Sequence, residues 1–202
     1  AIVGENGAGK STLMKTLYGL HRPDSGTVAV HGQVVDFRSP SDAIEAGIGM
    51  VHQHFMLADN LTVLENIILG AEPAKAGVIN AREAGRKIAE LAKSLGVEID
   101  VNSPVAELGV GQRQRVEILK VLYRGAKTLI LDEPTAVLVP QEVDELFDNL
   151  RRLVAAGTTV LFISHKLDEV LAVSNRITVI RQGTTVGTVT PAEVTRRQLA
   201  EM

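Results

Sequence analysis

The amino-acid sequence predicts an α/β fold built around a phosphate-binding loop. Residues Gly4 to Thr12 fit the pattern G-x-x-x-x-G-K-[ST], and the apolar residues 1–3 before them have the composition of a buried strand. Two further apolar runs, at 128–132 and 158–163, are typical of parallel strands buried on both faces. Between them, residues 140–154 repeat apolar side chains at intervals of three and four, which indicates an amphipathic helix. This alternation indicates a sheet that binds a nucleotide at the carboxyl ends of its strands.

The predicted phosphate loop has residue types that suit an anion. Its glycines let the backbone come close to phosphate oxygens, so that successive N–H groups can face them. The helix predicted for residues 11–17 adds the positive end of its dipole. Lys10 would bring a positive charge to the outer phosphates, and the Ser11 hydroxyl would ligate Mg²⁺. The predicted nucleotide-binding residues here are Gly4, Glu5, Asn6, Gly7, Ala8, Gly9, Lys10, Ser11 and Thr12.

Length and composition limit the class of protein. The 202 residues suffice for one sizeable domain or a domain with an insert. The net charge of −3 argues against a dedicated nucleic-acid-binding surface, and we expect no nucleic-acid partner. No apolar run approaches the length of a membrane span, and the absence of cysteine excludes disulfides and thiolate metal sites. Because the chain begins on a predicted strand without an initiator Met, we expect it to be a piece of a longer protein.

The first part of the chain, residues 1–54, predicts a core subdomain. After the first helix, apolar segments 27–30 and 33–37 flank His31-Gly32 and predict a hairpin. Ser39 as N-cap and Pro40 at the first helical position predict a short helix to Ala46. The apolar run 48–51 predicts a strand that ends just before Gln53.

The remaining chain predicts a helical insert at 55–124 and a second core part at 125–202. Within the insert we expect helices over 61–69, from a capping box at 80–83 through residue 95, and from about 113 to 123, so that the insert is all-helical. In the second core part, residues 177–180 and 185–189 predict a hairpin, and residues 190–193 predict the cap of a final helix.

Two adjacent carboxylates stand at the end of the apolar run 128–132: Asp132 is its last residue and Glu133 follows it. Nucleotide hydrolysis requires a carboxylate for Mg²⁺, a base for the attacking water and donors for charge on the γ-phosphate. Asp132 fits the metal role and Glu133 fits the role of the base. A pair of solvated acids at a strand end is the plainer alternative, which the phosphate loop upstream makes less favourable.

At this point the sequence resembles the ATP-binding cassette (ABC) ATPases over its whole length. Residues 4–12 are similar to the Walker A motif of that family, and residues 129–134 are similar to Walker B with its catalytic glutamate, Glu133. Gln53 resembles the glutamine of the Q-loop, a second metal-contacting and catalytic position, and His165 resembles the switch histidine. The family signature corresponds to Leu108, Gly109, Val110, Gly111 and Gln112.

Two positions depart from the family pattern. Gly109 stands where the signature has a serine, and therefore lacks the hydroxyl that would contact a γ-phosphate across the dimer. Val139 stands where many cassettes have aspartate. The adenine-stacking aromatic residue of the family would lie upstream of Ala1. The sequences of segments 47–57 and 133–138 resemble those of the first cassette of bacterial importers for nucleosides or simple sugars. These importers carry two cassettes in one polypeptide.

The resemblance implies a P-loop NTPase core that binds ATP and Mg²⁺ and hydrolyses ATP to drive uptake of a small polar solute. Its implied partners are a second cassette, which closes head to tail over two ATPs, and transmembrane permease subunits, which would hold it at the cytoplasmic face of the cell membrane. Two alternatives stay open. A non-transport ATP-driven clamp would carry a long coiled-coil or basic insert, whereas a degenerate regulatory cassette would agree with Gly109.

Overall fold

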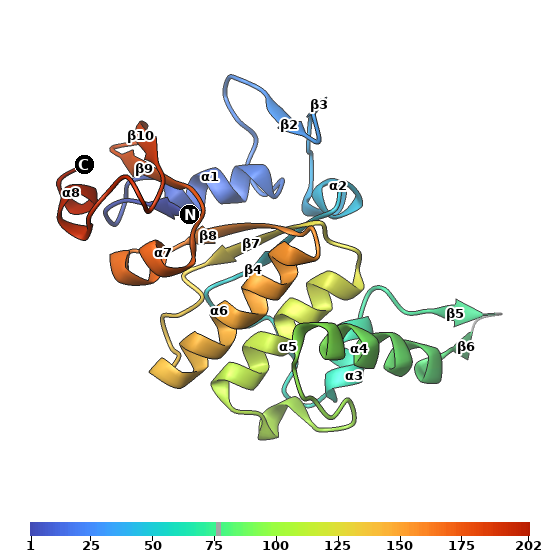
Figure 1. The fold of residues 1–202 in the computed structure, drawn as a ribbon. Helices are drawn as coiled ribbons and strands as arrows, with labels where there is room; N and C mark the ends of the chain where they lie inside the picture. The colour runs from blue at the N-terminus through green and yellow to red at the C-terminus, as the bar shows by residue number, and fades with distance from the viewer. Residues whose placement is uncertain (76–77) are drawn as a thin grey trace.

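The computed structural model of the chain describes residues 1–75 and 78–202. Its centre is a six-stranded sheet in the order β10-β9-β1-β8-β7-β4, parallel except for β10, which pairs with β9 in the antiparallel sense (Figure 1). The strands are β1 (Ile2–Val3), β4 (Ile48–Val51), β7 (Thr128–Asp132), β8 (Thr159–Ile163), β9 (Ile177–Arg181) and β10 (Thr184–Val189). The predicted α/β fold with a parallel sheet is therefore confirmed.

Successive strand residues face opposite layers, so the sheet has a core on each side. Leu129 and Leu131 of β7 belong to one apolar cluster, whereas Ile130 between them belongs to the other. The cluster around Ile130 is covered by α1 (Lys10–Leu17) and α2 (Pro40–Glu45). Figure 1 shows these two helices above the sheet and the longer helices below it.

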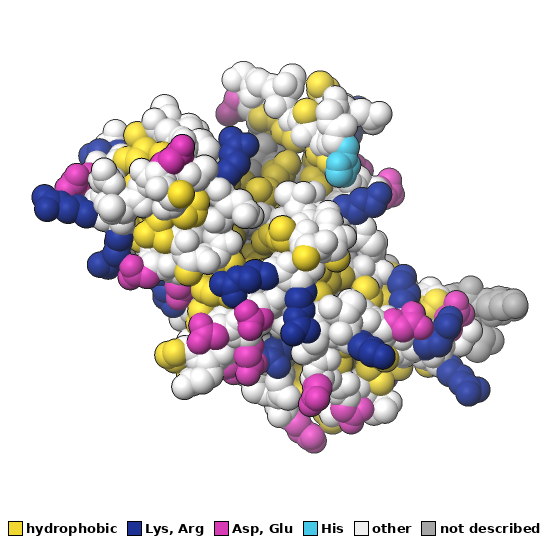
Figure 2. All heavy atoms as spheres, in the orientation of Figure 1, with side chains coloured by type: hydrophobic (Ala, Val, Ile, Leu, Met, Phe, Trp, Pro, Cys, Tyr) yellow, Lys and Arg dark blue, Asp and Glu magenta, His cyan; other side chains and the backbone are white. Residues whose placement is uncertain are grey.

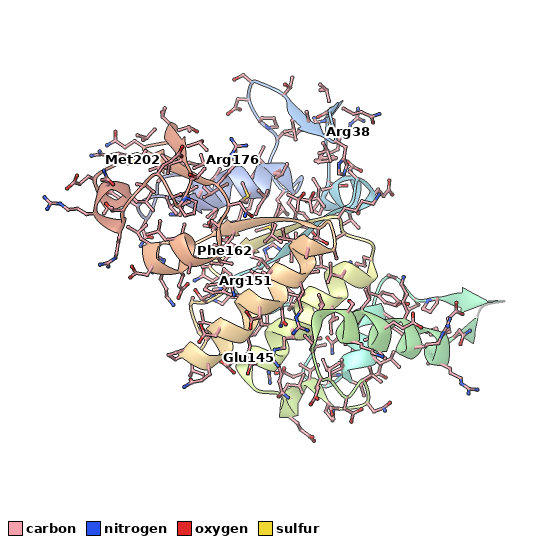
Figure 3. All side chains as sticks on the ribbon, viewed as in Figure 1. Arg38, Glu145, Arg151, Phe162, Arg176 and Met202 are labelled. Atoms are coloured by element: carbon pink, nitrogen blue, oxygen red, sulfur yellow. The ribbon has the colours of Figure 1, made fainter. Side chains whose placement is uncertain are left out.

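The layer below the sheet contains the longest helices of the chain. In α6 (Pro140–Ala155) the apolar repeat expected from the sequence buries Leu146, Leu150 and Leu153. Phe147 of the same helix meets Phe162 of β8 edge to face, with ring centroids 6.0 Å apart. Figure 3 labels Phe162 on the sheet beside this helix. This layer also contains α3 (Val63–Ile68), α4 (Ala81–Leu95) and α5 (Val110–Tyr123). A short 3₁₀ turn, η1 (Val105–Glu107), precedes α5.

The insert is not helical throughout, which corrects the expectation of an all-helical segment. A short hairpin of β5 (Ala74–Lys75) and β6 (Val78–Ile79) separates α3 from α4. The predicted capping box before α4 forms only in part: Asn80 accepts from the backbone N–H of Glu83, but the Glu83 carboxylate accepts from the Asn80 side chain rather than its backbone. The Asn80 backbone N–H donates instead to the Pro73 carbonyl.

Two helix boundaries and one whole helix differ from the sequence expectation. Helix α5 begins at Val110, because Gln112 accepts a hydrogen bond from the Gly109 N–H and closes the first turn earlier than expected. Helix α7 (Leu167–Val173) was not expected. The last helix, α8 (Arg196–Glu201), begins later than predicted: Glu193 accepts from the Thr190 N–H to close a separate turn, and Thr195 caps the helix instead. The expected hairpin after α1 is confirmed as β2 (Val28–Val30) and β3 (Gln33–Val35).

The surface has no large region of one charge on the face drawn in Figure 2, where acidic and basic side chains are intermixed. Over the described residues 1–75 and 78–202, none of the helices has the length and apolar character required to cross a membrane.

Candidate functional site

The loop between β1 and α1 is held by close backbone contacts. Gly4 lies so near β9 that a Cβ atom on it would be 2.0 Å from the Ile180 carbonyl oxygen. The Gly183 N–H, in the turn between β9 and β10, donates to the Ala8 carbonyl at 3.1 Å. Gly9 takes a left-handed conformation, with φ of 98°, and has no side chain to cap α1. The first N–H groups of α1 are therefore left for an anion bound in the loop.

Lys10 lies folded inside this loop. Its side chain is almost fully buried, with 7% exposed, and its Nζ donates to the carbonyl oxygens of Gly4 at 2.8 Å and Glu5 at 3.0 Å. The ammonium group is thus held by the loop itself rather than by an acidic side chain. This position places a positive charge beside the backbone that would surround phosphate oxygens.

Ser11 and Asp132 meet at the carboxyl edge of the sheet. Ser11 stands in the first turn of α1 and Asp132 ends β7, and the Ser11 Oγ donates to Asp132 Oδ1 at 3.2 Å. Asp132 is 8% exposed. A hydroxyl and a carboxylate oxygen are hard ligands of the type Mg²⁺ prefers, and their separation lets one small ion contact both after a small rearrangement. The two residues therefore fit the predicted magnesium site.

Glu133 and His165 follow neighbouring parallel strands and form a pair. Glu133 Oε2 lies 2.8 Å from His165 Nδ1. The Glu133 side chain is largely buried, whereas the His165 side chain is 58% exposed. Glu133 has a positive φ of 51°, uncommon for a residue with a side chain, and its N–H donates to the Ile163 carbonyl at 3.0 Å. Such conformations persist where the surroundings fix them, and they concentrate at functional sites.

Gln53 lies at the same edge, after the neighbouring strand β4. Val51 of β4 pairs with Leu131 of β7, so the residues after both strands emerge side by side. The Gln53 side chain is exposed, and within the described ranges its amide has no hydrogen-bond partner. Its predicted roles in metal binding and catalysis stay predictions.

The loop after Gln53 is anchored to the helices below the sheet. Glu117 of α5 accepts from the Met56 N–H at 2.5 Å, and Lys120, one turn later, donates to the Met56 carbonyl at 3.1 Å. Asn66 of α3 is fully buried and binds both the N–H and the carbonyl of Ala58. Burial raises the pKa of the Glu117 carboxyl above its usual range, although the nearby Lys120 charge opposes this shift. None of these anchors is expected from the sequence, because each joins residues of different elements.

The predicted signature segment, 108–112, is remote from the phosphate loop within one chain. It lies at the beginning of α5, which packs into the apolar cluster on the face of the sheet opposite α1 (Figure 1). Gly109, Val110 and Gln112 are exposed. The Gly111 N–H donates to the carboxylate of Glu142 at 3.2 Å, and the same carboxylate accepts from the Val139 N–H at 3.2 Å. The segment is therefore fixed to the beginning of α6 while its outer surface stays open.

Comparison with known proteins agrees with this arrangement. The ABC transporter family profile matches residues 1–136. The chain is 52% identical to the glucose import ATP-binding protein TsgD13 of Haloferax volcanii and 51% identical to the nucleoside import ATP-binding protein NupA of Lactococcus lactis. Both alignments cover 100% of this chain but only 42% and 40% of those proteins. The chain thus spans about two fifths of the length of these curated relatives.

Solved structures with the same fold are also cassettes. A nucleotide-free ATP-binding cassette from an ABC transporter superposes with a TM-score of 0.85 at 27% identity, covering 98% of this chain and 83% of that one. The dimeric, post-hydrolysis cassette MJ0796 bound to ADP and Pi superposes with a TM-score of 0.77 at 25% identity, covering 94% of this chain and 84% of that one. From its matching profile, fold and edge-of-sheet residues, we conclude that this chain belongs to the ABC transporter family.

Proposed function

We propose that this chain is the ATP-binding and ATP-hydrolysing cassette of an importer for a small polar solute, a nucleoside or a simple sugar. One observation supports this most: the carboxyl edge of the sheet brings together Lys10, the Ser11–Asp132 contact and the Glu133–His165 pair. These are the charge, metal-ligand and base functions that phosphoryl transfer to water requires. The names of the relatives, which are import proteins for glucose and nucleosides, support the transport role.

Each residue in the proposed site has a distinct task. The loop N–H groups and Lys10 bind the β- and γ-phosphates of ATP, with the signature segment of a second cassette closing over them. Ser11 and Asp132 hold Mg²⁺, with Gln53 as a third contact, and the ion neutralises phosphate charge when bound. Glu133 accepts a proton from the attacking water. His165 orients the Glu133 carboxylate through Nδ1 and presents its other ring nitrogen to the γ-phosphate.

The proposed partners are a second cassette and the permease subunits at the cytoplasmic face of the cell membrane. The exposed signature segment, remote from the phosphate loop of its own chain, is available to a second cassette. The dimeric MJ0796 structure supports such pairing. We assign the permease contact to the region around Gln53 and the insert at 55–124, between core parts 1–54 and 125–202.

The proposal predicts that Lys10→Ala loses MgATP binding and turnover. Lys15, one turn further along α1 and outside the loop, is the matched control, and Lys15→Ala should retain both. MgATP binding is measured by titration calorimetry and turnover by phosphate release, in the full-length protein. Wild-type affinity and rate in Lys10→Ala would remove the assignment of the phosphate loop.

The solute is tested separately from the chemistry. The full-length protein, assembled with its permease in proteoliposomes, should take up a radiolabelled nucleoside or monosaccharide only with ATP on the cassette side. Competition between unlabelled nucleosides and sugars decides between the two solute classes. ATP hydrolysis without uptake of either class would keep the ATPase assignment and reject the proposed solutes.

A further inference from the structure

A second connection joins the two loops that carry Glu133 and His165. Beyond the Glu133–His165 contact itself, Thr135 on the first loop is bound by two side chains from the second loop and the helix that follows it. These side chains belong to Lys166, which directly follows His165, and to Glu169 in the first turn of α7. Neither residue is part of the proposed site described above.

The contacts form a closed ring of hydrogen bonds. The Thr135 hydroxyl donates to Glu169 Oε2 at 2.5 Å, and the Thr135 carbonyl accepts from Lys166 Nζ at 2.9 Å. The ring closes through an ion pair between Lys166 Nζ and Glu169 Oε1 at 3.1 Å. Thr135 is fully buried, and the Glu169 side chain is only 16% exposed. A buried hydroxyl and carbonyl would cost free energy without partners, so the ring fixes the position of Thr135.

Each of the two loops joined by the ring is also held by a hydrogen bond outside the ring. Lys166 precedes the first residue of α7, and its N–H donates to the fully buried Ser164 hydroxyl at 3.0 Å. On the other loop, the carbonyl of Pro134 accepts from the buried Gln114 side chain at 2.6 Å. The residue before Pro134 is Glu133, which is held at a positive φ of 51°. A strained backbone of this kind requires neighbours that over-determine it, and the N–H of Ala136, directly after Thr135, donates to the Glu133 carbonyl at 3.2 Å.

We propose that Lys166 and Glu169 are positioning residues that, through Thr135, keep the Glu133 carboxylate aligned with His165 for hydrolysis. They do not touch the reacting atoms. When the ring is broken, the loop after Glu133 relaxes and the carboxylate leaves its place beside the attacking water, whereas the phosphate loop is unaffected. This inference rests on the proposed ATPase function, because only turnover can report on it.

The test uses variants of the full-length protein that each remove one polar group from the ring. Thr135→Val removes the hydroxyl at nearly constant shape, and Lys166→Met removes the ammonium group but keeps the stem. We expect kcat to fall about ten- to a hundredfold in each, because small displacements of a catalytic group have effects of this size, with the MgATP Kd nearly unchanged. Thr135→Ser and Lys166→Arg restore the lost donor and should recover most of the rate.

The matched control is Asp168→Asn, which removes an exposed carboxylate from the same turn of α7 and should leave kcat unchanged. Rates are divided by the number of ATP molecules bound per protein, so that a partly unfolded variant does not imitate a slow one. Thermal unfolding of each variant is measured alongside.

The results separate this inference from the proposed function. Thr135→Val and Lys166→Met that hydrolyse at the wild-type rate per bound ATP would overturn the positioning role while leaving the ATPase function intact. A Kd that rises in parallel with the loss of rate would also overturn it, because the ring would then act on binding. A wild-type protein that binds MgATP but never hydrolyses it would refute the proposed function, and the positioning role with it.

Discussion

Replacing Gly4 with alanine is predicted to damage the phosphate loop through one steric contact. The added Cβ would lie 2.0 Å from the Ile180 carbonyl oxygen and 3.1 Å from the Ile180 carbonyl carbon. Both strands at this point are internal to the sheet, and Val3, just before Gly4, pairs with Val179 of β9. Neither backbone can withdraw without weakening the β1–β9 ladder. The flexible side of the contact is therefore the loop that begins at Gly4.

The magnitude follows from the cost of overpacking. Forcing an extra methyl group into a well-packed site costs about 1–3 kcal/mol, and here the neighbour is backbone, which cannot rotate away. If the loop shifts to relieve the contact, this cost appears as lost MgATP affinity, of roughly 5- to 150-fold at about 1.4 kcal/mol per factor of ten. If the loop stays in place, the same cost appears in the free energy of unfolding.

The assay measures both quantities on the full-length protein, by urea denaturation and by MgATP titration. Gly157→Ala is the control, because Gly157 also has a positive φ, of 93°, but has open space around its Cβ and precedes β8 at the opposite edge of the sheet. It should lose only about 1 kcal/mol of stability, from the left-handed conformation, and no affinity. A Gly4→Ala protein with wild-type affinity and stability no lower than Gly157→Ala would refute the reasoning.

Three further predictions concern separate steps. Glu133→Gln keeps the shape of the side chain but removes the base, so MgATP should still bind while phosphate release in a single-turnover assay falls at least about a hundredfold; release at the wild-type rate would contradict the role of Glu133. Gly109→Ser should fit without strain, since φ there is −65° and the nearest atom to a Cβ is 3.7 Å away, and site-resolved nucleotide binding should change only at the partner's site. The pKa of the Glu117 carboxyl is raised in the folded protein above the ordinary value of 4.5, so the folded state binds this proton more tightly than the unfolded chain does. The free energy of unfolding should therefore fall as pH rises from 4.5 through the raised pKa. Glu117→Gln should flatten that part of the stability profile in urea denaturation, and an unchanged profile would show that Glu117 does not cause it.

Much of the fold could be predicted because its signals are local. The continuous apolar runs of β7 and β8, the three-and-four repeat of α6 and the glycine pattern of the phosphate loop each lie within a short stretch of sequence. Helix α7 was missed because seven residues are too few to show a repeat, and Lys166 before it is not a usual N-cap residue. The start of α8 was misplaced because residues 190–193 form a turn that resembles a helix cap in sequence.

The part of the candidate site that lies at the ends of the parallel strands could be predicted from the sequence. Ser11, Asp132, Glu133 and His165 could be placed at one sheet edge because parallel strands direct their carboxyl ends the same way, and the structure brings them together in pairs. The ring around Thr135 could not be predicted, since it depends on two loops crossing at hydrogen-bonding distance. Sequence spacing carries no information about such a crossing.

The central place of β1 in the sheet has a consequence for how the chain acquires its site during synthesis. Ile2 pairs with Ile163 on one side and with Thr178 on the other, so β1 cannot be fully paired until β8 and β9, much later in the sequence, have been translated. At roughly 5–20 residues per second, a ribosome needs about 10–30 s to supply them. The helices of the insert have local contacts and can form meanwhile. The phosphate loop cannot be fixed in place until β8 and β9 have paired with β1. ATP in the cell should therefore act only on the last stage of maturation, by trapping chains whose sheet has just closed.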